Sequence, residues 1–170
     1  AVNTKDGLKI INVTSKTVIG SFVGIGVVGR PVVDSSDVIY VFDKDGKVNA
    51  LSANNKLWTT EIAINGSTLA LDEENSALYT VGSDGNVYKI DIFNKGAASV
   101  FYNLGGNASS IMIDNDGTVY IGSDNGKVSA INSEAKLLWT FCCCNILRKK
   151  SSSWIKMVLS MFIPVKQFMQ

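Results

Sequence analysis

Three copies of one pattern run through this chain of 170 residues. Two copies read VIYVFDKDGKVNALSANNKLW over 38–58 and TVYIGSDNGKVSAINSEAKLLW over 118–139, and ALYTVGSDGNVYKID over 77–91 lies between them. A partial copy, DGLKIINV, starts at Asp6. One glycine, expected to lie in a turn, recurs in each copy at intervals of 39, 39 and 41 residues: Gly7, Gly46, Gly85 and Gly126. A period of this length is typical of stacked or radial repeat arrays.

Each full copy predicts four β-strands, because short runs of alternating apolar residues are bounded by Gly, Asn, Asp and Ser. In the middle copy these strands are expected over 68–72, 78–82, 87–91 and 99–104. The second strand joins the third through Asp-Gly or Asn-Gly, which suits a two-residue hairpin with positive φ at both central residues. The dipeptides are Asp45-Gly46, Asp84-Gly85 and Asn125-Gly126. No amphipathic helix pattern precedes residue 141, so the predicted body is all-β.

Four antiparallel strands every 40 residues or so could form β-propeller blades or a long sandwich. Near-copies at a fixed spacing favour the propeller. The prediction is a partial β-propeller of about three and a half four-stranded blades: a half blade over 1–28 and blades over 29–66, 67–107 and 108–141. A tyrosine recurs in each second strand, at Tyr40, Tyr79 and Tyr120. We expect these rings to pack between blades rather than to bind a ligand.

Two strings give the repeat a family resemblance. KVSAIN over 127–132 with KLLW over 136–139, and KVNALS over 47–52 with KLW over 56–58, resemble the pyrroloquinoline-quinone-type propeller repeat. The resemblance implies that a tryptophan of the fourth strand docks each blade on its neighbour. The middle copy departs from this pattern, because Lys89 replaces the alanine and no tryptophan follows. Phe101 or Tyr102 is expected to fill that place.

The resemblance also implies a function. The Thr-Gly that usually precedes the lysine is missing, as in relatives that carry no cofactor, such as the bacterial outer-membrane assembly lipoprotein and extracellular sensor domains. The expectation is a non-catalytic scaffold that binds a protein or ligand, in an extracytoplasmic location. The alternative is a fragment of a quinone-dependent alcohol or sugar dehydrogenase, with quinone and calcium sites in other blades. A third reading is a fragment that does not fold stably alone and has no function.

The predicted ring is incomplete, since family members close about seven or eight blades. Blades at a cut end would expose apolar faces that favour self-association. From Cys142 the repeat gives way to CCCNILRKKSSSWIKMVLSMFIPVKQFMQ. The stretch 154–165 is interrupted by Lys156 and falls short of the roughly 20 apolar residues of a membrane span. Read in a shifted frame, the codons for 154–170 permit DKDGIVYVYTSKAVYA, which resembles 114–130; we therefore expect 142–170 to be an out-of-frame tail.

No catalytic, cofactor-binding or metal-binding residue is predicted. The chain has no histidine, which removes the commonest general base, and a net charge of +1 provides no broad attraction for nucleic acid. The cysteines Cys142, Cys143 and Cys144 lack the spacing of a zinc site. The acidic segments 43–46, 72–75 and 114–117 are interpreted as turns rather than calcium loops, because Asp and Asn stabilise turns by themselves. The glycine-rich run 20–29 is interpreted as a connector between blades.

Overall fold

The computed structural model describes residues 2–5, 7–53, 55–66 and 68–142, and these form fifteen β-strands in four antiparallel sheets. Sheet A has three strands, in the order β1 (Val2–Thr4), β2 (Gly7–Asn12) and β3 (Thr17–Val23). Sheet B has four: β4 (Val27–Val33), β5 (Ile39–Asp43), β6 (Val48–Leu51) and β7 (Lys56–Thr59).

Sheets C and D repeat the four-stranded arrangement. Sheet C consists of β8 (Ala70–Asp72), β9 (Ala77–Val81), β10 (Asn86–Asp91) and β11 (Ala97–Asn103). Sheet D consists of β12 (Ala108–Ile113), β13 (Val119–Ser123), β14 (Lys127–Ile131) and β15 (Leu137–Cys142). The described residues contain no helix, and the all-β prediction is confirmed. The four strands expected for the middle copy all exist, each within a few residues of its predicted bounds.

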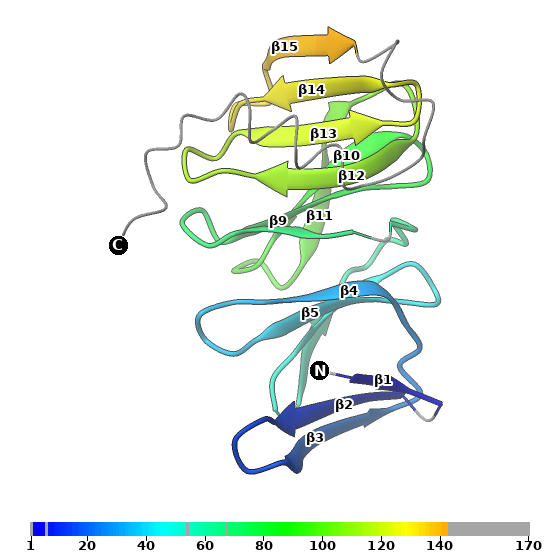
Figure 1. Ribbon diagram of the computed structural model, residues 1–170, viewed down its shortest axis with the longest axis vertical. Coiled ribbons are helices and arrows are strands. Elements are labelled where there is room, and N and C mark those ends of the chain that lie inside the picture. Colours follow the sequence, from blue (N-terminus) through cyan, green and yellow to red (C-terminus); the bar gives the residue numbers. More distant parts are fainter. Residues whose placement is uncertain (1, 6, 54, 67, 143–170) are drawn as a thin grey trace.

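The sheets are stacked face to face along the long axis of the molecule, from sheet A at one end to sheet D at the other (Figure 1). Side chains alternate across each strand, so one face of a sheet packs on the preceding sheet and the other on the following sheet. In β5, Val41 belongs to the cluster shared with sheet A, whereas Tyr40 and Phe42 belong to the cluster shared with sheet C. This arrangement is a partial β-propeller, as predicted.

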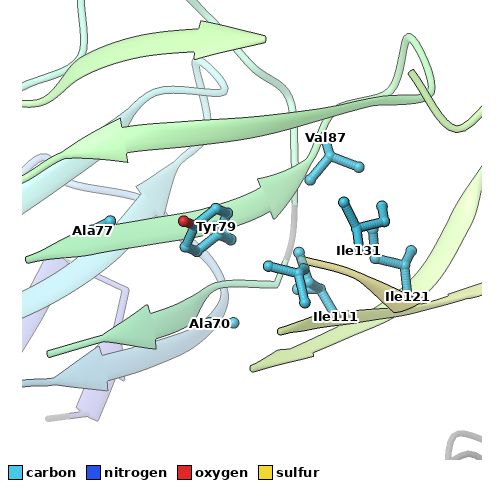
Figure 2. Close-up of a cluster of buried hydrophobic side chains, with 8 residues drawn as sticks. Ala70, Ala77, Tyr79, Val87, Ile111, Ile121 and Ile131 are labelled. Carbon is cyan, nitrogen blue, oxygen red and sulfur yellow. The ribbon is translucent and has the colours of Figure 1, made fainter. Parts of the chain in front are cut away.

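Three apolar clusters hold the stack together. The cluster between sheets C and D shows their composition: Tyr79 and Val87 come from sheet C, and Ile111, Ile121 and Ile131 come from sheet D (Figure 2). Each of these side chains is at most 7% exposed. Burial of an aliphatic or aromatic side chain stabilises a fold by roughly 1.5–3 kcal/mol, so these clusters supply the main driving force for stacking.

The hairpins between second and third strands differ from the prediction. Gly46 N donates to Asp43 O at 3.1 Å, and Asp43 N donates to Lys47 O at 2.9 Å, so three residues form the loop. Only Gly46 among them has a positive φ, of 76°. This is a type I turn followed by a glycine in the left-handed region, which is the common three-residue hairpin. The expected two-residue turn with two positive φ angles is therefore wrong.

Two further expectations about glycines are corrected. Gly7 does not lie in a turn like Gly46, because it is the first residue of β2 and pairs with Thr4. The glycine-rich run 20–29 is not a connector over its whole length, since β3 extends to Val23 and β4 begins at Val27. The register of β4 on β5 shifts between Val28 and Val32, around Pro31. Proline lacks the donor that a regular ladder needs, so it is tolerated in this irregular edge strand.

Candidate functional site

The candidate site is an acidic rim, made by the three turns that join the first strand to the second in sheets B, C and D. It consists of residues 34–37, 72–75 and 114–117. The three turns lie on the same side of the stack, at the left in Figure 1. Seven of their residues are acidic and none is Lys or Arg: Asp34, Asp37, Asp72, Glu73, Glu74, Asp114 and Asp116.

The inner carboxylates of the rim hold the turns in shape. Asp34 accepts hydrogen bonds from Ser36 N at 2.9 Å, Val38 N at 2.9 Å and the Tyr40 hydroxyl at 2.8 Å. Asp114 repeats this set in sheet D, with Thr118 N at 2.9 Å and the Tyr120 hydroxyl at 2.8 Å. Hydrogen bonds to an ionised acceptor are the strong ones, so each carboxylate ties its turn to the buried end of the next strand.

Burial and the nearby carboxylates change the chemistry of the tyrosines. Burial, with the hydrogen bond to Asp114, raises the pKa of Tyr120 to about 12. Burial, with the charge of Asp72, raises the pKa of Tyr79 to about 12. Tyr40 shows the same direction, because burial and the Asp34 hydrogen bond both raise its pKa. At neutral pH these hydroxyls are protonated, and those of Tyr40 and Tyr120 donate hydrogen bonds to Asp34 and Asp114.

Neighbouring turns are joined into one continuous rim. Glu73 Oε1 accepts a hydrogen bond from Ser35 N at 2.6 Å, which links sheet C to sheet B. On the other side, a methyl group added to Gly117 would lie 3.6 Å from Asn75 Nδ2, which places the turn of sheet D against that of sheet C. The rim is thus a fixed surface that crosses three sheets.

Four acidic side chains of the rim are exposed to solvent: Asp37, Glu73, Glu74 and Asp116. Since the whole chain carries a net charge of +1, the negative charge is a local property of this edge. Such a surface attracts and orients cationic groups, and it does so less strongly at high salt. From the sequence, two of these three segments were interpreted as turns without a binding role. The signal that could have indicated the rim is the absence of Lys and Arg from all three turns.

The opposite edge of the stack uses its acids in the same structural way. Asp84 accepts hydrogen bonds from Asn86 N at 3.0 Å and from the Tyr88 hydroxyl at 2.7 Å. The Tyr88 hydroxyl hydrogen bond lowers the pKa of Asp84. Asp43 accepts from Lys47 N at 2.9 Å. The acidic segments 43–46, 72–75 and 114–117 form turns, which these contacts and those of Asp72 and Asp114 hold in shape. Within 2–142, apart from residues 6, 54 and 67, no three acidic or cysteine side chains are grouped to hold a metal ion.

The remaining candidates are placed as follows. Tyr40 and Tyr79 are fully buried between sheets, which confirms their packing role, whereas Tyr120 is only partly buried. Phe101 takes the expected place beside Tyr79, with ring centroids 5.0 Å apart.

Cys142 is disulfide-bonded and ends β15, where it pairs with Lys127. Cys143 and Cys144 lie outside the described residues, as do the stretch 154–165 and nearly all of the expected out-of-frame tail. In the described part of the chain no helix is long and apolar enough to cross a bilayer.

Comparison with solved structures identifies proteins of similar fold. BamB from Moraxella catarrhalis matches with a TM-score of 0.56 and 19% identity, over 74% of this chain and 40% of BamB. A protein of unknown function from Bacteroides thetaiotaomicron matches with a TM-score of 0.56 and 18% identity, over 77% of this chain and 37% of that protein. Virginiamycin B lyase from Staphylococcus aureus matches with a TM-score of 0.55 and 12% identity, over 66% and 40%.

These matches concern the fold. The chain spans about 40% of the length of the similar structures. Neither a family model nor a curated protein matches the sequence. The similar structures are β-propeller-like proteins, and the stacked sheets of this chain share that fold.

Proposed function

We propose that this chain is part of a β-propeller scaffold without a catalytic centre, and that its acidic rim binds a basic segment of a protein partner. The observation that carries the proposal is the rim itself, in which three adjacent turns bear seven acidic and no basic side chains. Loops held by a rigid scaffold are the usual place for recognition. Complementary charge then sets the specificity and the rate of association.

The non-catalytic part of the proposal is supported by how the polar groups are used. Asp34, Asp72 and Asp114 accept the hydrogen bonds that shape their turns. Burial raises the pKa values of the nearby Tyr79 and Tyr120 hydroxyls further above neutral pH, which makes their ionisation harder. Similarity of fold does not decide the question, since one similar structure is named as a lyase and another as BamB. We also propose an extracytoplasmic location, for which the support is the resemblance of the repeat.

The binding proposal is tested with an oligolysine peptide, by calorimetry on the whole chain at several salt concentrations. We expect binding that weakens as salt rises. The triple variant Asp37→Asn, Glu74→Gln and Asp116→Asn removes three exposed charges of the rim whose carboxylates make none of the turn hydrogen bonds described above, and it should weaken binding at least about tenfold. The matched control, Asp45→Asn with Glu61→Gln and Asp124→Asn, changes the net charge equally on the other edge. Equal losses in both variants, or no binding at all, would contradict the proposal.

The absence of a catalytic cofactor is tested separately. Pyrroloquinoline quinone and calcium are titrated into the protein while the absorbance spectrum of the quinone is recorded. The proposal predicts a spectrum equal to that of the free quinone at every protein concentration. A saturable shift that requires calcium would support the dehydrogenase alternative instead.

A further inference from the structure

We propose that the partner of the acidic rim is an α-helix with a basic row of side chains along one flank and an acidic row along the other. This inference rests on the binding role proposed above, because it concerns the same edge of the stack. It is carried by a second set of residues, four lysines that stand outside the rim. Together they are called the lysine arc: Lys16, Lys56, Lys95 and Lys136.

The lysine arc lies at the same edge of the stack as the acidic rim. The strands of each sheet are antiparallel and follow sequence order, so the turn between the third and fourth strands returns to the edge where the first strand joins the second. In sheet D both turns lie at the left in Figure 1. The arc has one lysine per sheet, in or directly beside this turn: Lys16 before β3, Lys56 at the start of β7, Lys95 between β10 and β11, and Lys136 before β15.

The four lysines are available to a partner. All of them are exposed, and within the residues that the structure describes none is held in an ion pair. Lys16 and Lys95 have φ angles of 55° and 49°, in the left-handed region that favours Gly and Asn. The segments 13–16, 52–56, 92–96 and 132–136 contain four lysines and a single acidic residue, Glu134. The outer part of this edge is therefore positive.

The rim and the arc form two parallel rows of opposite charge. The rim turns join the first and second strands of a sheet and the arc turns join the third and fourth, so the rows are two strand spacings apart. Neighbouring strands lie about 4.8 Å apart, which separates the rows by about 10 Å. Successive charges within one row follow the spacing of stacked sheets, which is also about 10 Å.

An α-helix matches both of these spacings. Its diameter with side chains is about 10–12 Å, so its two flanks reach the two rows at once. At a rise of about 1.5 Å per residue, about seven residues cover the distance between successive sheets. Residues seven apart also lie on nearly the same side of a helix, because two turns take about 7.2 residues. An extended segment directs successive side chains to opposite faces, so only one of its rows would meet the edge.

The chemistry of the partner follows from this match. We expect Lys or Arg at every seventh position on the flank over the rim, and Asp or Glu at every seventh position on the flank over the arc. Complementary charge fixes the register of such a helix and disfavours segments with one sign of charge only.

The probes are two alanine-rich peptides of three heptads with the same composition. In the two-row peptide, lysines occupy one flank at every seventh position and glutamates occupy the opposite flank. In the mixed peptide, lysine and glutamate are exchanged in the middle heptad. Circular dichroism checks that the two peptides have equal helix content, and fluorescence anisotropy measures binding to the whole chain at low salt. We expect the two-row peptide to bind at least about tenfold more tightly.

Variants of the chain show whether the arc causes this preference. One variant removes three charges of the arc: Lys56→Gln, Lys95→Gln and Lys136→Gln. The matched control removes three exposed lysines at the opposite edge: Lys5→Gln, Lys44→Gln and Lys127→Gln. The arc variant should bind both peptides equally, whereas the control variant should keep the preference for the two-row peptide.

An oligolysine peptide separates this inference from the proposed function on which it rests. Oligolysine pairs with the rim alone, so the arc variant should bind it at least as tightly as the parent chain does, because three repelling charges are gone. Failure of oligolysine to bind the parent chain would overturn both proposals. If oligolysine binds, the helix inference alone is overturned by equal binding of the two helical peptides to the parent chain. It is also overturned by a preference that survives in the arc variant, or by one that the control variant loses equally.

Discussion

The ring of Tyr40 lies beside the ring of Trp58, with centroids 5.8 Å apart and planes inclined at 38°. Tyr120 and Trp139 repeat the contact in sheet D, and in sheet C Phe101 takes the place of the tryptophan beside Tyr79. The sequence repeat is therefore a repeat of one packing contact. Aromatic pairs of this kind contribute about 0.5–1.5 kcal/mol beyond the area that they bury.

Removing a buried side chain between sheets B and C should destabilise the whole stack. Leu78 is 0% exposed in that cluster, and Leu78→Ala should lower the free energy of unfolding by about 2–5 kcal/mol through lost burial and the cavity left behind. Urea unfolding followed by circular dichroism at fixed protein concentration measures the change. Leu57→Ala, at a half-exposed position of β7, is the control and should cost less than about 1 kcal/mol. Equal costs would show that sheets B and C are not packed as described.

The bond between Asp34 and Tyr40 should show energetic coupling. Asp34→Ala leaves two backbone donors and the Tyr40 hydroxyl without their acceptor, so we expect a loss of about 1–3 kcal/mol of stability. Tyr40→Phe removes only the hydroxyl and should cost about 0.5–1.5 kcal/mol. The loss of stability in the double variant should be smaller than the sum of the two single losses, because each single variant already removes the same hydrogen bond. Simple additivity would mean that the bond does not form in solution.

Stability should decline at alkaline pH because of the buried tyrosines. Burial raises the pKa of Tyr79 from 10.0 to about 12, so between these values the unfolded chain loses a proton that the folded chain keeps. The free energy of unfolding therefore falls as pH rises through this window, with a limiting slope of about 1.4 kcal/mol per pH unit for one such group. Below pH 10 the contribution is fully present. Tyr79→Phe should make the slope shallower in chemical unfolding at several pH values, and an unchanged slope would argue against burial of this hydroxyl.

Two turn glycines should respond differently to the same substitution. Gly46 and Gly126 have φ angles of 76° and 77°, which an alanine adopts at a cost of about 1–2 kcal/mol. A methyl group on Gly126 would meet no heavy atom within 4 Å, whereas one on Gly46 would collide with the side chain of Asn65. Gly126→Ala should therefore show the conformational cost alone, and Gly46→Ala a larger one. Thermal unfolding of the two variants compares them directly, and a greater loss for Gly126→Ala would refute the placement of Asn65 against this turn.

The sequence predicts the repeat architecture well because packing imposes a period on it. Tyr40, Tyr79 and Tyr120 recur because each second strand must fill the same gap between sheets. The substitution of Phe101 for a tryptophan was also predictable, since an aromatic ring was needed beside Tyr79. These features depend on side-chain size and alternation, which a single sequence records.

Features that depend on backbone geometry or on neighbouring turns were harder to predict. Asp-Gly suits both two-residue and three-residue hairpins, and only the hydrogen bonds around Gly46 distinguish them. Gly7 keeps the glycine spacing but is the first residue of β2 and pairs with Thr4, because the first hairpin differs from the others. The acidic rim arises when three turns, each unremarkable alone, come together on one side of the stack. Ser35 and Glu73 are 38 residues apart in sequence, and their contact becomes visible only in three dimensions.

The central claim is that each recurring tyrosine packs against the sheet that follows its own along the chain, Tyr40 of sheet B against sheet C and Tyr79 of sheet C against sheet D. Nuclear Overhauser effects from the tyrosine rings to assigned methyl groups test it most directly. We predict contacts from Tyr40 to the methyl groups of Leu78 or Ile90, and from Tyr79 to those of Ile111 or Ile131. Contacts from the Tyr40 ring to the methyl groups of Leu8 or Ile10, on the sheet behind it, would contradict the account.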